Sequence, residues 1–597
     1  QVALPGSLIE IGDSAFEGCV TLSEIMLPGS VELIGDAAFR NCVLLKNVYF
    51  SEAVTFIGDY AFAGCVQLVQ AVLPDAIVSL GAYAFSGTGL KEITLPAGLS
   101  VLSEGTFENC AALEKVVLTE SISEIGDYAF KNCAKLSEIE ILSGVVSLGV
   151  NPFFGCASLD TYIIAEESES FMLIDGVLFG ADGKTLYSYP AGKEGSYTVA
   201  DGVTVRPYAF AGADLSELIV SDGATLLDGA LAGGTYGSVQ LPSSLKTLPD
   251  SLFKDAKIGA VTPPSGVTVI GEYAFQGAEI DSIVIPNAVT AISQYAFEGS
   301  SLSNLTFESG GTEGLTIGTY AFANCTSLEH LVVPSRVRVA YTSSVTPVDN
   351  YAFYGCTSLL DVVFEETPAS GGVEGVLRLA QYVFAGCTSL KSAEFPSALG
   401  RTTSNVWGIY SYSFDGCVSL ESVTFAEPVE GAETYGLGSY LFRGCTSLKQ
   451  FEIPSWVYSL GAGLFESSGI EELTIPETVT GSIGSYLCRY AENLKKVVYN
   501  GGSTTQIAQS AFQGCVSLES VEILNEKIVT FGKNAFDGCV SLKYFVIPER
   551  ITSVNADAFK GWTSAQTIRI EGGEAQASEW TDGWDNECEA TIVYGKT

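Results

Sequence analysis

The chain has 597 residues, of which 47% are hydrophobic and 16% are charged, so it carries ample apolar material for a core and is not generally disordered. Its 69 acidic and 29 basic residues give a net charge of −40, which phosphate backbones and anionic membranes would repel. Because of this charge, nucleic acid binding is not expected. No run of 18 apolar residues occurs, so membrane insertion is not expected either.

The chain opens inside a repeated unit. Residues 1–5 read Gln-Val-Ala-Leu-Pro and lack the basic and apolar stretches of a signal segment. Either a signal peptide has been removed or the chain is an excised fragment, and the sequence leaves both alternatives open.

Phenylalanine recurs along the chain with a period close to 23 residues. The position is recognisable in 22 units, where it is filled 20 times by phenylalanine and once each by Leu231 and Cys488. Such regularity indicates a repeat protein in which each unit stacks on its neighbours. The phenylalanines of the series are Phe16, Phe39, Phe62, Phe85, Phe107, Phe130, Phe153, Phe210, Phe253, Phe275, Phe297, Phe322, Phe353, Phe384, Phe414, Phe442, Phe465, Phe512, Phe536 and Phe559.

One unit shows how a single coil is built. Ile25 and Leu27 alternate with polar or variable positions, as in a strand with one buried face, and Pro28 ends this strand. A second apolar pair, Val31 and Ile34, precedes a tight turn that carries the next phenylalanine inward. Because one coil cannot bury its own apolar edge, the coils must stack, at about 4.8 Å per strand.

The repeated motif resembles that of a known family. Residues 57–68 read Ile-Gly-Asp-Tyr-Ala-Phe-Ala-Gly-Cys-Val-Gln-Leu and fit the pattern I-G-x-x-A-F-x-G-C-x-x-L of the BspA-like (TpLRR or LRR_5) leucine-rich repeat family. The resemblance covers nearly the whole chain. It implies a mostly β, right-handed leucine-rich-repeat solenoid of about 22 short coils, with a parallel strand ladder and a C-terminal cap. It also implies a secreted or cell-surface protein, bacterial in most members, that takes part in adhesion.

The spacing of the repeats divides the chain into six segments. Regular repeats are interrupted by a hairpin-like island and by a run of lengthened repeats with projecting loops, and a cap follows the last coil. The expected segments are regular repeats over 1–160, 201–299 and 442–570, the island over 161–200, the lengthened repeats over 300–441 and the cap over 571–597.

Two of these segments depart from the repeat in composition. Asp182 and Gly183 lie between apolar runs, which is a hairpin signal. Near the C-terminus, Trp580 and Trp584 fit either an aromatic carbohydrate-binding patch or a cap that shields the last coil, and the cap is favoured.

Thirteen of the fifteen cysteines lie three residues after the phenylalanine position, from Cys19 to Cys539. Other repeats place alanine or serine there, which a metal ligand would not tolerate, and adjacent rungs of a ladder have poor geometry for disulfides. We therefore expect free, buried thiols in a small-residue packing slot, with no metal and no cofactor. An Asp-x-Asp-x-Asp-Gly calcium loop is also missing.

His330 is the only histidine in the chain. It falls at a variable strand position between Leu328 and Leu331, which indicates an exposed surface residue. No nucleophile elbow or Cys-His signature accompanies it, so no catalytic residue is assigned.

Two surfaces are candidates for binding. The first is the outward row of the strands, which begins with Tyr49, Val72, Thr94 and Val117 and continues through later repeats. This row fits either a solvated sheet face or a contact surface, because β-branched residues suit a strand in any case.

The second surface is a loop ridge formed by four lengthened repeats. The phenylalanine spacing rises to 25, 31, 31, 30 and 28 residues after Phe297 and returns to 23 at Phe465. The extra residues form the loops Ser335–Pro347, Glu365–Arg378, Ser397–Gly408 and Ala426–Gly436.

We expect these four loops to project from one side of successive coils, where solenoids often build binding sites. Arginine, tyrosine and tryptophan are enriched at binding hot spots. Structural decoration is the alternative, and nearby glutamates argue against a purely basic patch. The candidate contact residues are Arg336, Arg338, Tyr341, Arg378, Arg401, Trp407 and Tyr435.

The sequence favours a monomeric, non-catalytic recognition or adhesion scaffold that is secreted or displayed at the cell surface. Its ligand would be a protein or glycan of a host or of a neighbouring cell. A structural component of a surface assembly is the alternative. A glycan-active enzyme is least favoured, because it would need two carboxylates about 5–10 Å apart in a cleft, and no acid-rich strand cluster interrupts the repeat.

Overall fold

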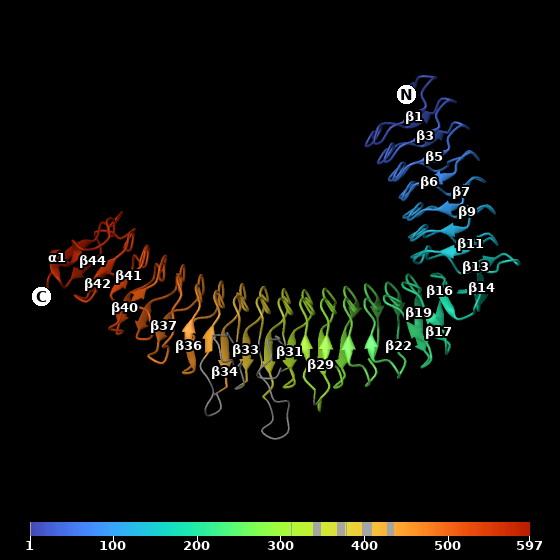
Figure 1. The fold of residues 1–597 in the computed structure, drawn as a ribbon. Coiled ribbons are helices and arrows are strands. Elements are labelled where there is room, and N and C mark those ends of the chain that lie inside the picture. The colour runs from blue at the N-terminus through green and yellow to red at the C-terminus, as the bar shows by residue number, and fades with distance from the viewer. Residues whose placement is uncertain are drawn as a thin grey trace. The chain divides into compact units, whose positions relative to one another are not determined.

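The computed structural model describes residues 2–311, 313–337, 348–366, 377, 379–396, 409–426 and 435–596. The chain divides into two compact units. Unit 1 comprises residues 1–264 and 274–280, and unit 2 comprises residues 265–273 and 281–597. Each unit is a β-solenoid of stacked coils (Figure 1). The parallel strand ladders form about 24 turns in all. The stack of coils predicted from the period and the mostly β, leucine-rich-repeat fold implied by the family resemblance are both confirmed.

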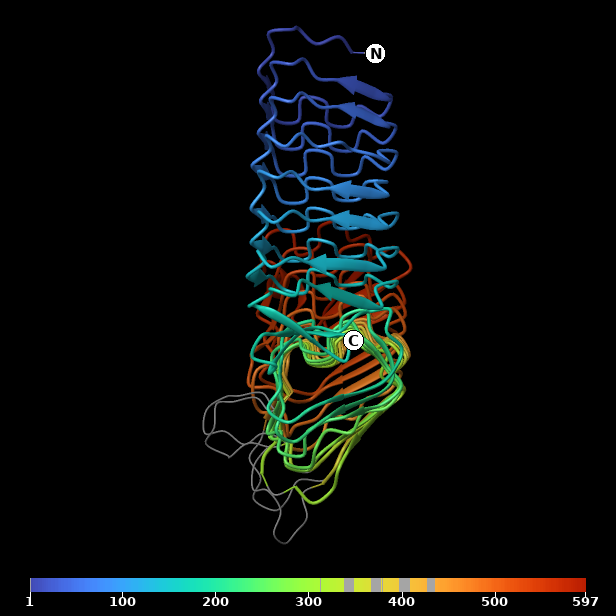
Figure 2. The ribbon, with the colours of Figure 1, turned by 90° about the vertical axis from the view of Figure 1, so that its right-hand side faces the viewer.

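Each regular coil of unit 1 contributes a longer and a shorter strand. In the longer strands, alternate side chains point inward, so Ile25 is buried and Met26 is exposed. These strands are β2 (Glu24–Met26), β4 (Asn47–Tyr49), β7 (Glu92–Thr94), β9 (Lys115–Val117), β11 (Glu138–Ile141) and β13 (Thr161–Ile164). They pair in parallel and in register two by two, β2 with β4, β7 with β9 and β11 with β13, and Figure 2 shows the strands one above another.

The shorter strands of unit 1 have two residues each and form two further parallel ladders. In every one of them the second residue is buried, so the apolar residue that recurs at this position of the repeat faces the core. These strands are β1 (Glu10–Ile11), β3 (Leu33–Ile34), β5 (Phe56–Ile57), β6 (Ser79–Leu80), β8 (Val101–Leu102), β10 (Glu124–Ile125) and β12 (Ser147–Leu148).

The island is built from antiparallel hairpins. β14 (Phe171–Ile174) pairs with β15 (Val177–Gly180), which pairs with β16 (Thr185–Ser188). Asp182 holds the second turn by accepting hydrogen bonds from the backbone N–H groups of Lys184 (2.9 Å) and Thr185 (3.0 Å), and these bonds lower the pKa of its carboxyl. The hairpin predicted at this position is confirmed.

Parallel pairing resumes after the island. The strand β16 pairs with the next short strand, so the hairpins join the solenoid directly. The remaining strands of unit 1 are β17 (Gly195–Val199), β18 (Thr204–Val205), β19 (Asp214–Val220), β20 (Thr225–Leu226), β21 (Thr235–Tyr236), β22 (Val239–Gln240), β23 (Thr247–Leu248), β24 (Lys257–Ile258) and β26 (Glu279–Ile280).

Unit 2 repeats the same coil and adds the only α-helix of the described residues. Its longer strands are β27 (Ser282–Ile285), β29 (Asn304–Phe307), β31 (His330–Val333), β32 (Asp361–Phe364), β33 (Ser392–Phe395), β34 (Ser422–Phe425), β37 (Glu472–Ile475), β38 (Lys496–Tyr499), β40 (Ser520–Ile523), β42 (Tyr544–Ile547), β44 (Thr567–Ile570) and β45 (Thr591–Tyr594). Its other elements are β25 (Val269–Ile270), β28 (Ala291–Ile292), β30 (Thr316–Ile317), β35 (Tyr435–Leu437), β36 (Val457–Leu460), β39 (Gln506–Ile507), β41 (Thr530–Phe531), β43 (Ser553–Val554) and α1 (Gly573–Ala577).

The phenylalanine series forms a stacked column inside each unit. Ring centroids of successive coils are 5.1 Å apart for Phe16 and Phe39 and 4.9 Å apart for Phe297 and Phe322, with nearly parallel planes. Leu231 is fully buried in the same slot, as is Cys488 in unit 2. The sequence prediction of one inward residue per coil is confirmed.

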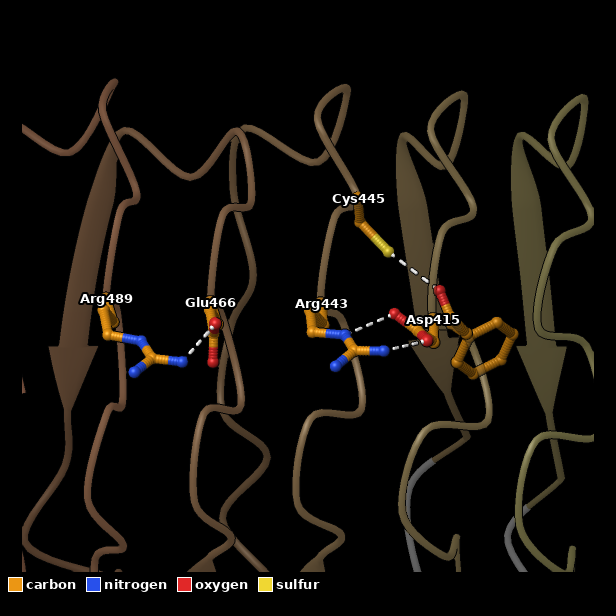
Figure 3. A network of polar contacts seen from close by, with 6 residues as sticks. Asp415, Arg443, Cys445, Glu466 and Arg489 are labelled. Carbon is orange, nitrogen blue, oxygen red and sulfur yellow. Dashed lines mark hydrogen bonds and ion pairs between the residues drawn. The ribbon is translucent and has the colours of Figure 1, made fainter.

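The cysteines line a second internal column. The Cys42 thiol donates a hydrogen bond to the Phe16 carbonyl oxygen at 3.0 Å, and Cys445 donates to Phe414 at 3.2 Å (Figure 3). Burial raises the pKa of Cys42 to about 11. The expectation of free, buried thiols holds along the column, with the exception of Cys19, which is exposed.

A third column, missed by the sequence reading, lies at the turn two residues before the phenylalanine. Seven tyrosines of unit 2 stack there with ring centroids 4.6 to 5.2 Å apart, and all have positive φ. The left-handed backbone costs about 1 kcal/mol per residue, which ring stacking of similar size offsets. This tyrosine ladder comprises Tyr273, Tyr295, Tyr320, Tyr351, Tyr382, Tyr412 and Tyr440.

The C-terminal cap closes the last coil of unit 2. β45 pairs in parallel with β44, and α1 contacts both strands. Trp580 and Trp584 are buried, and Trp584 packs edge-on against Phe559. Because little of either indole is accessible, the cap fits these residues better than a carbohydrate-binding patch does.

In two coils of the described chain, neither a longer strand nor an isolated bridge forms at the ladder position. In the first ladder break, Gln70–Leu73, no longer strand forms at the level between β4 and β7, and no backbone hydrogen bond of these four residues to the rest of unit 1 is present among the described residues. In the second ladder break, Gln450–Ile453, no longer strand forms at the level between β34 and β37.

A shortened turn follows each ladder break. In the coil after the first break, Leu90 follows Phe85 by five positions, whereas in the coil before it Leu68 follows Phe62 by six. The shorter turn brings Gly89 so close to the Val66 carbonyl oxygen that a Cβ would overlap it. At the second break, a Cβ on Gly469 would overlap the Thr446 carbonyl oxygen in the same way. Both turns therefore require glycine.

Candidate binding surfaces

The flanks of the four predicted loops are stacked in register. On one side, β31 to β34 form a continuous parallel ladder. On the other side, single parallel bridges join Val348, Leu379, Ile409 and Leu437 of successive coils. Each loop therefore connects two internal ladders at the same level of its coil, which gives the loops a common side of departure.

Most of the predicted contact residues fall outside the described residues. This applies to Arg338, Tyr341, Arg378, Arg401 and Trp407, and to the side chain of Tyr435, whose backbone begins β35. Arg336 is the member of the set whose side chain the structure places.

Arg336 does not face a ligand, which corrects the sequence-based expectation. It is 3% exposed, and its guanidinium donates hydrogen bonds to the carbonyl oxygens of Pro286 (3.2 Å) and Val289. Burial lowers the pKa of this group, although Glu308 acts in the opposite direction. Arg336 therefore ties its own turn to a turn two coils earlier.

The repeat position of Arg336 explains its burial. The equivalent Ser30 and Ser121 donate to turn carbonyls of the preceding coil, at 2.7 Å to Leu8 and 2.7 Å to Leu99. Arginine uses the same direction but reaches one coil further. Gly311 in the intervening coil leaves the space, because a Cβ there would lie 2.7 Å from Arg336 Cδ. Ser30 and Ser121 at the position of Arg336 were the signal in the sequence that this position faces the preceding turns and not a ligand.

The outward row of the strands is exposed, as the sequence predicted. In unit 1 it is partly apolar, with Met26 67% and Val72 85% exposed, and Tyr49 between them. A shallow hollow of about 480 Å³ lies beside the first ladder break and is lined by Val72, Glu92 and Val117, among others. This is a second surface open to a ligand.

His330 is exposed, as predicted, but it has a partner. Its side chain is 62% exposed, and Nδ1 lies 2.6 Å from the Asp361 carboxylate. The two residues are register neighbours on β31 and β32, so the pair joins adjacent coils at the surface. Within the described ranges, no group of three or more histidine, cysteine or acidic side chains could hold a metal ion.

In four successive coils of unit 2, the residue directly after the phenylalanine position is charged and alternates in sign, as Asp415, Arg443, Glu466 and Arg489 (Figure 3). Arg443 bonds both carboxylate oxygens of Asp415, at 2.7 and 2.5 Å, and its guanidinium lies 5.0 Å from the Tyr412 ring. Arg489 bonds Glu466 at 2.6 Å. Each acid here is paired with an arginine, and the hydrogen bonds to the Asp415 carboxylate raise the pKa of Arg443. We assign this charge row to coil stacking.

Parallel strand ladders, stacked phenylalanines and a terminal cap define this chain as a leucine-rich repeat solenoid. The model of the BspA type leucine-rich repeat region matches residues 1–75, 55–172, 203–329, 316–407, 372–495, 408–525 and 481–579. The chain therefore belongs to the BspA-type leucine-rich repeat family. The unmatched stretches, 173–202 and 580–597, correspond to most of the island and to the end of the cap.

Several solved structures are similar to this chain. A leucine-rich cell surface protein from Faecalibacterium prausnitzii A2-165 is 29% identical, over 50% of this chain and 83% of that protein, with a TM-score of 0.42. The T. pallidum leucine-rich repeat protein is 32% identical, over 26% of this chain and 72% of that one, with a TM-score of 0.24. A leucine-rich repeat protein from Bacteroides ovatus ATCC 8483 is 19% identical, over 94% and 87%, with a TM-score of 0.23.

No curated protein matches the sequence. Family membership favours a binding or scaffold role over catalysis. In the described part of the chain, no helix has the length and apolar character needed to cross a bilayer.

Proposed function

We propose that this chain is a non-catalytic recognition scaffold, secreted or displayed at a cell surface, that binds a protein or glycan through the loop ridge. The observation that carries the proposal is the stacking of the loop flanks. Four successive coils enter their loops from the ladder β31–β34 and leave them at the bridged positions between Val348 and Leu437. Loops that start and end at matching positions can act as one surface.

The composition of the ridge supports contact with a macromolecule. Arg338, Arg378 and Arg401 lie in a chain with a net charge of −40, and Trp407 is one of only five tryptophans. These residue types dominate binding hot spots. Because Arg336 is buried among the turns, we remove it from the contact set.

The test compares the full chain with a variant in which residues 338–347, 367–376, 397–408 and 427–434 are replaced by short Gly-Ser turns. Both are screened against a glycan array and extracellular matrix proteins. We expect the trimmed chain to keep the circular dichroism spectrum and thermal stability of the parent and to lose its ligand. Equal binding by both chains would rule out the ridge.

A single-residue comparison sharpens this test. Trp407→Ala and Arg401→Ala in the ridge should each weaken binding of any ligand the screen identifies. Arg336→Ala should lower stability instead, because it leaves the carbonyl groups of Pro286 and Val289 without their donor. If the full chain instead self-associates as its concentration rises and captures no ligand, the result would favour a role as a structural component of a surface assembly.

A further inference from the structure

The first three coils of unit 1 expose an unusual number of apolar side chains. Val66, Val69 and Val72 follow one another along a single coil and are 52%, 41% and 85% exposed. The two preceding coils add apolar side chains in the turn and on the strand. Together these residues form an apolar belt, comprising Val20, Met26, Leu44, Tyr49, Val66, Val69 and Val72.

The belt is local to these coils. The coils of unit 2 that contain Cys325, Cys356 and Cys387 follow each cysteine with threonine and serine, where the belt has valine or leucine. Exposed valines such as Val418 and Val516 do occur at this turn position, but serine and glutamate follow them. Clustered exposed apolar side chains mark interaction sites, whereas scattered ones do not.

The belt coincides with the first ladder break. Residues 66–73 contain no charged side chain, and the backbone of Gln70–Leu73 makes no hydrogen bond to another part of the described chain. Unpaired N–H and C=O groups therefore border the exposed valines. The second ladder break is a natural contrast, because Phe451 and Ile453 are buried there and Glu452 is exposed between them.

From these observations we infer that the belt docks an extended polypeptide with apolar side chains and basic flanks. The aliphatic side chains offer hydrophobic contact, and the belt contains a single aromatic ring, whereas a glycan site relies on aromatic faces and polar groups. Backbone groups without a partner in the described chain lie next to these valines, and extended peptides bind in part through main-chain hydrogen bonds.

Charge selects among polypeptides. Residues 1–100 carry ten acidic and three basic side chains, and the whole chain has a net charge of −40. A second copy of the chain would bring the same negative charge and be repelled, whereas a cationic segment would be attracted. The belt is separate from the loop ridge, so this inference does not depend on the proposed function.

The probe is a short fluorescent peptide of alternating valine and lysine, with valine–glutamate and serine–lysine peptides of equal length for comparison. Binding to the full chain is followed by fluorescence anisotropy. We expect the valine–lysine peptide to bind, more weakly as salt is raised because the charge attraction is screened, and the other two peptides to bind at least about tenfold more weakly.

The variant Val66→Thr, Val69→Ser, Val72→Thr replaces three exposed side chains with the types found in unit 2. It should keep the parent's thermal stability and weaken the valine–lysine peptide by about tenfold or more. The matched control is Val418→Thr, Val516→Thr, Val540→Thr, which changes isolated exposed valines of unit 2 and should leave binding unchanged.

Three outcomes would overturn the inference. They are equal loss of peptide in both triple variants, preference for the valine–glutamate peptide, and self-association of the parent chain, in sedimentation, that the belt variant abolishes. The last result would identify a second copy as the occupant. The loop-trimmed chain should bind the peptide normally, which separates the two surfaces experimentally.

Discussion

The phenol ring of Tyr440 covers the Cα of Gly463 in the next coil, at a point where a Cβ would overlap ring atoms Cδ1 and Cε1. Gly463 has a φ of +59° and ends the tyrosine ladder at this side. Tyr440 itself is fixed by stacking on Tyr412, with ring centroids 4.9 Å apart. The glycine thus serves both the turn and the close approach of the ring.

Gly463→Ala should therefore destabilise the chain more than a positive φ alone would. Strain of the left-handed backbone accounts for about 1 kcal/mol, and overlap with the Tyr440 ring should add about 1–2 kcal/mol. The control is Gly299→Ala, since Gly299 has a φ of +66° with open space around its Cα. Urea denaturation measures both, and equal losses would show that the ring moves aside freely.

The thiols should differ sharply in reactivity. Cys19 is exposed, Cys588 is half-buried and the other thirteen cysteines are buried. A thiol reagent at neutral pH should label Cys19 rapidly and Cys588 more slowly, while the column reacts only in denaturant. Cys19→Ser should remove the fast phase and nothing else. Rapid labelling of several column thiols in the native chain would contradict the packing of the coils.

The cysteine column should also make the fold sensitive to alkaline pH. Burial raises the pKa of Cys110 to about 11 and that of Cys65 to about 12, whereas an unfolded thiol ionises near ~8.5. Between these pKa values, the thiols lose their protons in the unfolded state and keep them in the folded state. Stability is therefore unaffected below pH ~8.5 and falls as pH rises toward the folded pKa, by about 1.4 kcal/mol per unit for each thiol.

Urea denaturation between pH 7 and 9.5 measures this slope. Cys110→Ala should reduce it, because alanine fills the same slot in other repeats and cannot ionise. An unchanged slope in Cys110→Ala would assign the alkaline loss to other groups.

The Asp415–Arg443 pair should couple more strongly than a more exposed pair of the same kind. It is bidentate and lies against the Tyr412 ring, whereas Arg40 and Glu17 are 3.7 Å apart and more exposed. Double-mutant cycles with alanine should give about 1 kcal/mol for the first pair and less than about 0.5 kcal/mol for the second. Similar couplings would show that the tyrosine ring adds nothing.

The interior was predictable from the sequence because each coil repeats the same burial. Phe39 and Leu45 recur in step with the strands, so period alone identifies them as core. Arg336 was misplaced because residue type was weighed above repeat position, and a long cation can reach carbonyls that serine bonds in other coils. Whether a residue contacts solvent or the neighbouring coil depends on that coil's sequence.

The tyrosine ladder and the ladder breaks were missed for a related reason. A tyrosine with positive φ is rare, and only the ring on the adjacent coil makes Tyr382 favourable there. The break at Gln70–Leu73 is followed by a turn that is one residue shorter and that brings Gly89 against the Val66 carbonyl. Both features arise between coils, whereas the motif describes one coil at a time.

The hydrogen bonds of the cysteine column have an evolutionary consequence. Cys417 and Cys445 each donate to the backbone of the coil before, and backbone carbonyls are the same whatever residue carries them. A tandem duplication of one whole coil would therefore supply its own donor and acceptor, and a deletion would rejoin matching ones. Unequal recombination could lengthen or shorten such a gene by whole coils without redesigning its interior.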